Sequence, residues 1–354
     1  MWFKSPFCPR SGRFRSLRKK FNLLPREVAH EFKHSLDCIV NKVCENKTYL
    51  NISGIKETIL QISQYNVRIA KNPSSSIMLH AHNNLEGAKN LPSERAFIMA
   101  WSIEILQSHR MLSACYKSEI EDPFWKVREN EMSAINQANI IRCFLYELLT
   151  YYFKGQEIHT EVLQLYNKAF ISSAILEYST KGIHKPFNFS WKQHEVICEY
   201  ETSCITFEVP LLLAIKLALI DGKILYDHIH KICLDLGKLC QIQDEYDNCF
   251  GDDSNRTSGT HIQEGKCTWL AVTALEHCTP AQRVVFNACY GSTEPAHVER
   301  IKYLYEQLKI PKLYREQIGY LTECVTKTAE ILNNNGLPSK IFFDLIDALC
   351  EEKK

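Results

Sequence analysis

Residues 236–275 read LGKLCQIQDEYDNCFGDDSNRTSGTHIQEGKCTWLAVTAL, and their pattern indicates a helix, a polar turn and a second helix. Apolar residues recur at helical spacing through residues 232–239 and lead into this stretch, which predicts a helix over residues 224–250 buried along one side. We expect Gly251 to end that helix, because glycine commonly follows the last helical turn. A further helix is predicted over residues 267–278.

The acids in this stretch predict a metal site. Asp244 and Asn248 are four residues apart, so both lie on one face of a helix. Oxygen ligands one turn apart suit Mg²⁺, which prefers carboxylates together with waters and phosphate oxygens. Arg256 and Lys266 follow with a hydroxyl-rich loop, and cations beside an acid cluster suit a metal-bound diphosphate. The same residues would also suit a solvated helix end with ordinary charges.

The helical period dominates the chain from Glu27 onward. Helices are expected from Glu27 past Val43, over residues 93–111 with Ser93 as N-cap, over 135–153, and over 191–220 with a kink at Pro210. Polar breaks are expected at Asn72–Ser76, His80–Asn90, Lys181–Asn188 and Gly251–Gly265. Without strand alternation or a long repeat, these patterns predict one all-helical domain over residues 27–354.

Composition excludes several classes of protein. The net charge of +1 argues against a nucleic-acid binder, and 13 Gly and 12 Pro in 354 residues disfavour an all-β fold. No apolar run approaches the roughly 18–20 residues that span a bilayer. The 15 cysteines are odd in number and widely scattered, so we expect reduced packing residues rather than a disulfide framework or a zinc site.

Residues 1–26 differ from the rest of the chain. They contain eight Lys or Arg and no Asp or Glu, mixed with Phe and Leu. This composition is typical of a mitochondrial transit peptide, and it also suits a basic surface tail. The expected location is therefore cytoplasmic or mitochondrial.

The segment Leu236–Leu275 closely resembles the second aspartate-rich region of farnesyl diphosphate synthases and related trans-isoprenyl diphosphate synthases. The family reads roughly FQIQDDYLDxFGD, then GTDIQ, then KCSWL. Trp101–Gln107 resembles the helix before the family's first aspartate-rich motif, Tyr200–Pro210 resembles YKTxxYSFYLP, and Tyr65-Asn-Val precedes the isopentenyl-diphosphate loop. The resemblance covers about residues 27–350. It implies an all-α isoprenoid synthase bundle around a central cavity, a homodimer, and two or three Mg²⁺ ions bound with substrate.

The sequence departs from the family at most of its charged positions. The first motif, DDxxD, corresponds to Ala114–Ser118 and has no aspartate, although acids within Glu119–Asp122 could supply a ligand in a shifted register. In the isopentenyl-diphosphate loop this chain keeps Lys71 but has Ser74 where the family has arginine. At the lysine position of the family's YKT motif, this chain has Glu201. The arginine pair after the first motif is missing, and the C-terminal tail contains acids.

These losses shape the functional prediction. A chain-elongating synthase binds two diphosphates, and each charge-assisted contact to such an anion contributes about 1.5–3 kcal/mol. We therefore expect a terpene synthase, a lyase or cyclase that ionises one allylic prenyl diphosphate, most simply farnesyl diphosphate. Two alternatives remain open. One is a prenyl diphosphate synthase with altered ligands, and the other is a non-catalytic partner subunit.

The resemblance also implies residue roles. Asp244 and Glu245 would be catalytic Mg²⁺ ligands, with Asn248 as a neutral ligand. The predicted substrate-binding residues are Gln241, Lys266, Thr202, Arg256, Lys71 and Gln107. The family's chain-length positions are His109 and Arg110. His109 is read either as a pocket residue or, preferably, as a hydrogen-bonded core histidine.

Overall fold

The computed structural model describes residues 23–47, 50, 52, 54–69, 73–87, 92–115, 131–180, 189–219, 223–251 and 259–350. Several sequence predictions concern residues outside these ranges. They are the basic leader up to residue 22, Lys71, the acids at 119–122 and Arg256.

Helices account for nearly all of the described residues, and no strand occurs among them. The first half of the chain forms α2 (Arg26–Glu45), α3 (Ile55–Ile69), α4 (Pro73–Leu85), α5 (Glu94–Cys115), α7 (Glu131–Phe153) and α8 (Ile158–Thr180). The middle forms α9 (Trp191–Ile197), the π-helical η2 (Cys198–Glu208), α10 (Val209–Leu217), α11 (Lys223–Phe250), α12 (Thr260–Gln263) and α13 (Trp269–His277). The chain continues through α14 (Pro280–Cys289), α15 (Pro295–Gln307), α16 (Ile310–Asn334) and α17 (Lys340–Cys350). The predicted all-α class is confirmed.

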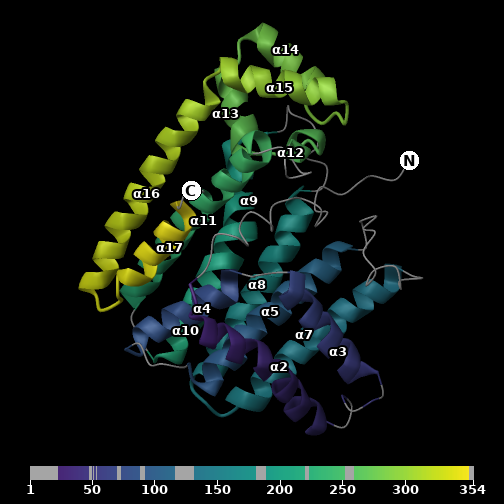
Figure 1. The fold of residues 1–354 in the computed structure, drawn as a ribbon, viewed down its shortest axis with the longest axis vertical. Coiled ribbons are helices and arrows are strands. Elements are labelled where there is room, and N and C mark those ends of the chain that lie inside the picture. The colour runs from purple at the N-terminus through teal and green to yellow at the C-terminus, as the bar shows by residue number, and fades with distance from the viewer. Residues whose placement is uncertain are drawn as a thin grey trace.

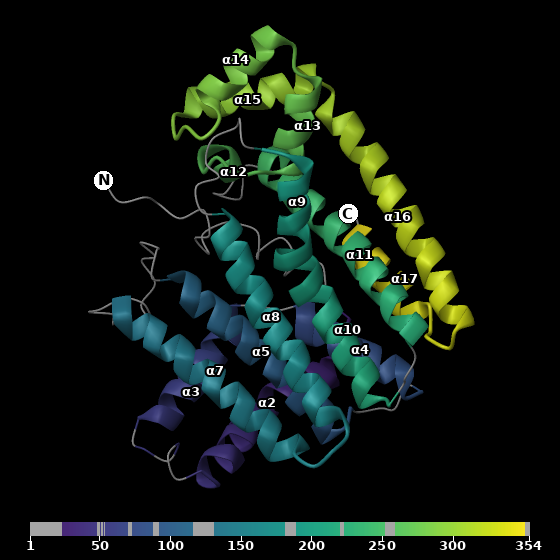
Figure 2. The same ribbon diagram turned by 180° about the vertical axis from the view of Figure 1, so that it is seen from behind.

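The helices pack as a bundle in which α11 is a central element. α11 contacts η2 on one side and α16 on another, while α5 packs on α7 and α4 packs on α10. Helices α14 and α15 lie at one end of the molecule, and α2, α3 and α7 lie at the opposite end (Figures 1 and 2). The long α16 runs from the first end back along α11 (Figure 1). This arrangement places the acidic end of α11 beside α9, α12 and α13.

One large apolar core runs through these contacts. It includes Phe144, Phe207 and Leu236, all fully buried. Burying each such side chain stabilises the fold by about 1.5–3 kcal/mol. The described cysteines are all free thiols, and many of them are buried, which confirms their predicted role as packing residues. None of the described helices combines the length and the apolar character needed to cross a bilayer.

The strongest periodic patterns are confirmed. α2 buries the predicted stripe of Val28, Phe32, Leu36, Ile39, Val40 and Val43. Ser93 precedes α5 as predicted, and its hydroxyl accepts a hydrogen bond from the backbone N–H of Ala96 at 3.3 Å. α11 begins and ends within one residue of its predicted bounds.

Two predicted breaks are wrong. A polar break was expected at Asn72–Ser76, but α4 begins at Pro73 and buries Ser74 and Ser75 in its first turn. Its proline needs no hydrogen-bond partner there, because the first N–H groups of a helix have none within the helix. The second break was expected from residue 80, yet α4 continues to Leu85. The buried carboxylate of Glu104 accepts a 2.5 Å hydrogen bond from the Ser75 hydroxyl, so a polar side chain is satisfied within the packed interior.

The predicted helix over residues 191–220 differs in its internal structure. A π-helical segment, η2, precedes Pro210, which occupies the first turn of α10. In the wider turn of η2 the Ser203 hydroxyl donates to the carbonyl of Cys198, five residues earlier, at 2.9 Å. Gly237 of α11 lies directly against this turn. A Cβ atom at position 237 would stand 2.7 Å from the Cα of Ser203, so only glycine permits the close contact.

Candidate functional site

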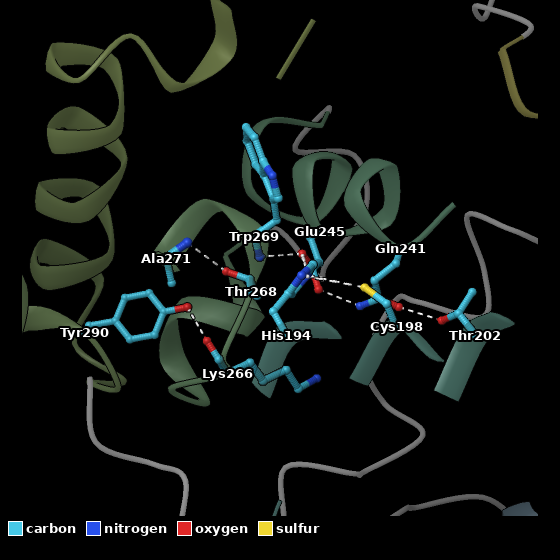
Figure 3. A network of polar contacts seen from close by, with 10 residues as sticks. All are labelled: His194, Cys198, Thr202, Gln241, Glu245, Lys266, Thr268, Trp269, Ala271 and Tyr290. Carbon is cyan, nitrogen blue, oxygen red and sulfur yellow. Dashed lines mark hydrogen bonds and ion pairs between the residues drawn. The ribbon is translucent and has the colours of Figure 1, made fainter. Parts of the chain in front are cut away.

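The acidic end of α11 is enclosed by other elements and is not a solvated helix end. Asp244, Glu245 and Asn248 are 5%, 1% and 8% exposed. Figure 3 shows the polar network that surrounds Glu245, with contributions from α9, η2, α11 and the start of α13. The alternative of an ordinary charged surface is therefore excluded for these three side chains.

Glu245 is the centre of this network. Its Oε2 accepts a hydrogen bond from the backbone N–H of Trp269 at 2.7 Å and lies 3.2 Å from Nε2 of His194. Its Oε1 accepts a hydrogen bond from the side-chain amide of Gln241 at 2.5 Å. A carboxylate only accepts hydrogen bonds, so Nε2 of His194 carries a proton.

His194 is buried between Glu245 and the Cys198 thiol, whose Sγ lies 3.6 Å from Nδ1 of the ring. Burial lowers the pKa of His194, but the Cys198 and Glu245 groups beside the ring outweigh burial and raise the pKa to about 10. The ring is therefore protonated at neutral pH, and its charge compensates the buried carboxylate.

The network continues from Gln241 into η2. The Thr202 hydroxyl donates a 2.6 Å hydrogen bond to the side-chain oxygen of Gln241. Two predicted substrate-binding residues are thus brought together, and the close contact at Gly237, one helical turn earlier, makes this approach possible.

Asn248 joins α11 to α12. Its side-chain oxygen accepts from the backbone N–H of His261 at 3.0 Å, and its amide donates to the Thr260 hydroxyl at 2.8 Å. Lys266 lies in the turn before α13, only 11% exposed at its side chain, with Nζ 2.6 Å from a carboxylate oxygen of Glu264. Tyr290 directly follows α14, and its hydroxyl donates a hydrogen bond to the Lys266 carbonyl at 2.7 Å, which holds this turn (Figure 3).

The predicted metal ligands do not form a complete, preformed metal-binding site among the described residues. In the part of the chain that the structure describes, no group of three or more His, Cys, Asp or Glu side chains is arranged to hold a metal ion. Protein donors occupy both carboxylate oxygens of Glu245 and the side-chain oxygen of Asn248. Mg²⁺ sites that use one or two carboxylates together with substrate phosphates do not require such a group, so Asp244 stays a predicted ligand.

A second polar group lies between α4 and α5. The Gln107 amide donates to the Ser74 hydroxyl at 3.4 Å, and the Arg110 guanidinium donates to the Gln107 side-chain oxygen at 3.1 Å. Burial lowers the pKa of Arg110, while the Glu201 carboxylate of η2 opposes this shift. Arg110 and Glu201 are therefore electrostatic partners, at positions where the resembling family has an apolar residue and a lysine.

His109 differs from the hydrogen-bonded core histidine that was preferred. Its Nδ1 is buried without a hydrogen-bond partner among the described residues. Its ring forms a T-shaped pair with Phe170, with 4.8 Å between the ring centroids. Burial and the nearby Arg142 and Arg110 charges lower its pKa to about 4, so the ring is neutral at pH 7.

Sequence reasoning missed His194 and Cys198. Their spacing of four residues, just ahead of Thr202, places them on one helical face. That spacing was the available signal, but the sequence does not show that this face meets Glu245.

Comparison with known proteins identifies the family. Residues 56–308 match the family model described as polyprenyl synthetase. The farnesyl pyrophosphate synthase of Murgantia histrionica is 26% identical over 344 residues, covering 93% of this chain and 84% of that protein. The Bos taurus farnesyl pyrophosphate synthase is 28% identical over 323 residues, covering 86% and 88%. That of Homo sapiens is 30% identical over 278 residues, covering 74% and 65%. This chain belongs to the polyprenyl synthetase family.

The comparisons correct the functional prediction. We expected a terpene synthase with lyase or cyclase activity, but the relatives that match along most of the chain are farnesyl pyrophosphate synthases. The missing arginines and aspartates were given too much weight against a resemblance that extends over most of the chain. The chain-elongation alternative agrees better with these relatives.

Proposed function

We propose that this protein is a prenyl diphosphate synthase of the farnesyl type with an altered metal motif. It would form a carbon–carbon bond between isopentenyl diphosphate and an allylic prenyl diphosphate, break the allylic C–O bond, and release pyrophosphate and a proton. The observation that carries this proposal is that farnesyl pyrophosphate synthases match most of the chain, while α11 presents Asp244 less than one turn after Gln241, which is hydrogen-bonded to Thr202.

In this proposal Asp244 would help to hold Mg²⁺. The bound ion would supply positive charge that stabilises the substrate diphosphate as a leaving group. Lys266 and the Thr202–Gln241 pair would bind the same diphosphate, together with Arg256. Lys71 and Gln107 would face isopentenyl diphosphate. Arg110 brings a guanidinium to Gln107 beside Ser74, the position from which the family's arginine is missing.

A second candidate is a non-catalytic partner subunit of a prenyl synthase. Two observations favour it. The oxygens of Glu245 and Asn248 are engaged by protein donors, and no aspartate occurs in Ala114–Ser118.

One assay separates the two candidates. The protein is incubated with Mg²⁺, labelled isopentenyl diphosphate and each short allylic diphosphate, and prenyl diphosphates are analysed. A longer prenyl diphosphate, lost in Asp244→Ala and kept in Asp235→Ala, supports elongation. Asp235 is the matched control because it is an aspartate of the same helix whose partner is Lys231, one turn earlier. Absence of any longer product refutes elongation. Stimulation of an authentic prenyl synthase on mixing then identifies a partner subunit.

We also propose that two copies of the chain associate. Ile171, Ile175 and Tyr178 on α8 are 50%, 42% and 80% exposed, and their spacing puts them on one helical face. An apolar stripe of this kind is typical of an interface. Light scattering should give twice the mass of 41.0 kDa, and Ile175→Asp should reduce the measured mass.

We propose a cytoplasmic or mitochondrial location from the basic residues 1–26. Imaging of the full chain with a C-terminal fluorescent tag tests this location.

A further inference from the structure

The start of α13 is held by a side chain from another helix. Trp269 is the first residue of α13, and N–H groups at that position have no partner within the helix. Glu245 of α11 supplies the acceptor at 2.7 Å. Two residues further on, the N–H of Ala271 is capped locally by the Thr268 hydroxyl at 3.1 Å. A carboxylate is favoured at this end of a helix because the helix dipole is positive there.

His194 fixes the orientation of that carboxylate. Its Nε2 reaches the same Oε2 that accepts from Trp269, and Gln241 holds the other oxygen. These groups come from α9, α11 and the first residue of α13, and Figure 3 shows them converging on Glu245. Glu245 is only 1% exposed, and each of its two oxygens already accepts a hydrogen bond from these donors.

The turn held in this way carries Lys266, three residues before Trp269. We propose that His194 and Glu245 form a clamp that positions Lys266 against α11, and that Glu245 is a positioning residue rather than a Mg²⁺ ligand. The inference deepens the proposed function and rests on it in one respect, since Asp244 and Lys266 are taken as the groups that meet the metal and the diphosphate.

Shortening Glu245 separates the two roles. Glu245→Asp restores the residue type found in the family motif and keeps the charge, so a metal ligand would bind Mg²⁺ at least as well. A clamp would loosen, because the carboxylate becomes one methylene shorter and cannot reach both Trp269 and His194. Glu330→Asp on α16 is the matched control, since Glu330 is exposed.

His194 is tested by a pair of substitutions. His194→Phe removes the donor to Glu245, whereas His194→Gln can place a side-chain N–H near the position of Nε2. We expect the phenylalanine variant to lose the clamp and the glutamine variant to recover much of it. General loss of a buried imidazole would affect both variants alike, so the difference between them reports the hydrogen bond.

Two readouts are used, and neither requires turnover. The first is hydrogen exchange at the Trp269 amide, with the Ala271 amide as an internal control. Glu245→Asp and His194→Phe should speed exchange at Trp269 about tenfold or more and leave Ala271 little changed, as expected for loss of a charge-assisted hydrogen bond. The second is calorimetric binding of inorganic pyrophosphate with Mg²⁺, which should weaken about tenfold in both variants.

Unchanged exchange at Trp269 in both variants would overturn the clamp. Pyrophosphate binding by Glu245→Asp that equals or exceeds the wild type would also overturn it and return Glu245 to the metal ligands. If the wild-type protein fails to bind Mg²⁺ with pyrophosphate, the proposed function fails, while the exchange measurement still decides whether the clamp exists.

Discussion

Gly237→Ala tests the contact that brings η2 against α11. A Cβ atom at this position would lie 1.9 Å from the Ser203 hydroxyl, 2.7 Å from its Cβ and 2.7 Å from its Cα. The hydroxyl can rotate away, but the Cα is backbone, so one of the two helices must move. The Thr202–Gln241 hydrogen bond lies next to this contact and should lengthen or break.

The expected free-energy change combines two opposing effects. Alanine is favoured over glycine within a helix by about 1 kcal/mol. Overpacking a close contact costs about 1–3 kcal/mol, and a clash with backbone lies at the upper end of that range. Loss of the neighbouring buried hydrogen bond adds about 1 kcal/mol. The sum predicts that Gly237→Ala lowers the free energy of unfolding by about 3 kcal/mol.

Gly319→Ala on α16 is the matched control. Nothing lies within 4 Å of a Cβ atom built there, so the same substitution should raise the free energy of unfolding by about 1 kcal/mol. Urea unfolding followed by circular dichroism measures both variants. Adding Ser203→Gly to Gly237→Ala should recover part of the lost stability, because it removes the contacts with the Ser203 hydroxyl and Cβ. Recovery should be incomplete, because the 2.7 Å contact with the Cα of residue 203 remains. If Gly237→Ala is as stable as Gly319→Ala, the close contact between η2 and α11 is refuted.

Three further predictions concern charged groups. The pKa of His109 is about 4 in the folded chain and near 6.5 when exposed, so the neutral ring contributes stability above pH 6.5 that is lost as pH falls through 4. Between pH 7 and pH 4, wild type should lose about 3 kcal/mol more than His109→Phe in urea unfolding, and equal losses would contradict the assigned pKa. Glu201→Lys should lower the free energy of unfolding, because it sets a lysine beside Arg110. Adding Arg110→Leu should restore about 1 kcal/mol or more of that free energy. Strictly additive effects in this double-mutant cycle would argue against the pairing of Arg110 with Glu201. Asp244→Asn should weaken calorimetric binding of Mg²⁺ with pyrophosphate about tenfold to a hundredfold, whereas unchanged affinity would remove Asp244 from the metal site.

Local pattern predicted those helices that bury a continuous apolar stripe. α2 and α11 have such stripes, so their bounds could be read from the sequence. α4 was missed because its Ser- and His-rich sequence resembles a loop, and the buried partners that satisfy it lie on α5, thirty residues away in the chain. The π-helical turn of η2 leaves no periodic signal, and it depends on the glycine that faces it from α11.

The residues of the site could be predicted from the sequence, but most of their partners could not. Family motifs located Asp244, Gln241 and Thr202, and the structure brings Thr202 into contact with Gln241. The motif did not reveal that Glu245 is surrounded by donors, because two of the three donors come from α9 and from the backbone of α13. Hydrogen bonds to backbone groups depend on tertiary packing and have no residue-type signature.

The π-helical segment also constrains how the chain can change in length. Residues before η2 and residues after it belong to one uninterrupted run of helix, so the segment sets the angle between their side chains. Deleting one residue from Cys198–Glu208 would rotate the helix before the deletion about its axis relative to the helix after it. His194 would then point away from α11 even though no residue of the network had been substituted. Insertions and deletions here should therefore be as damaging as substitutions in the site itself.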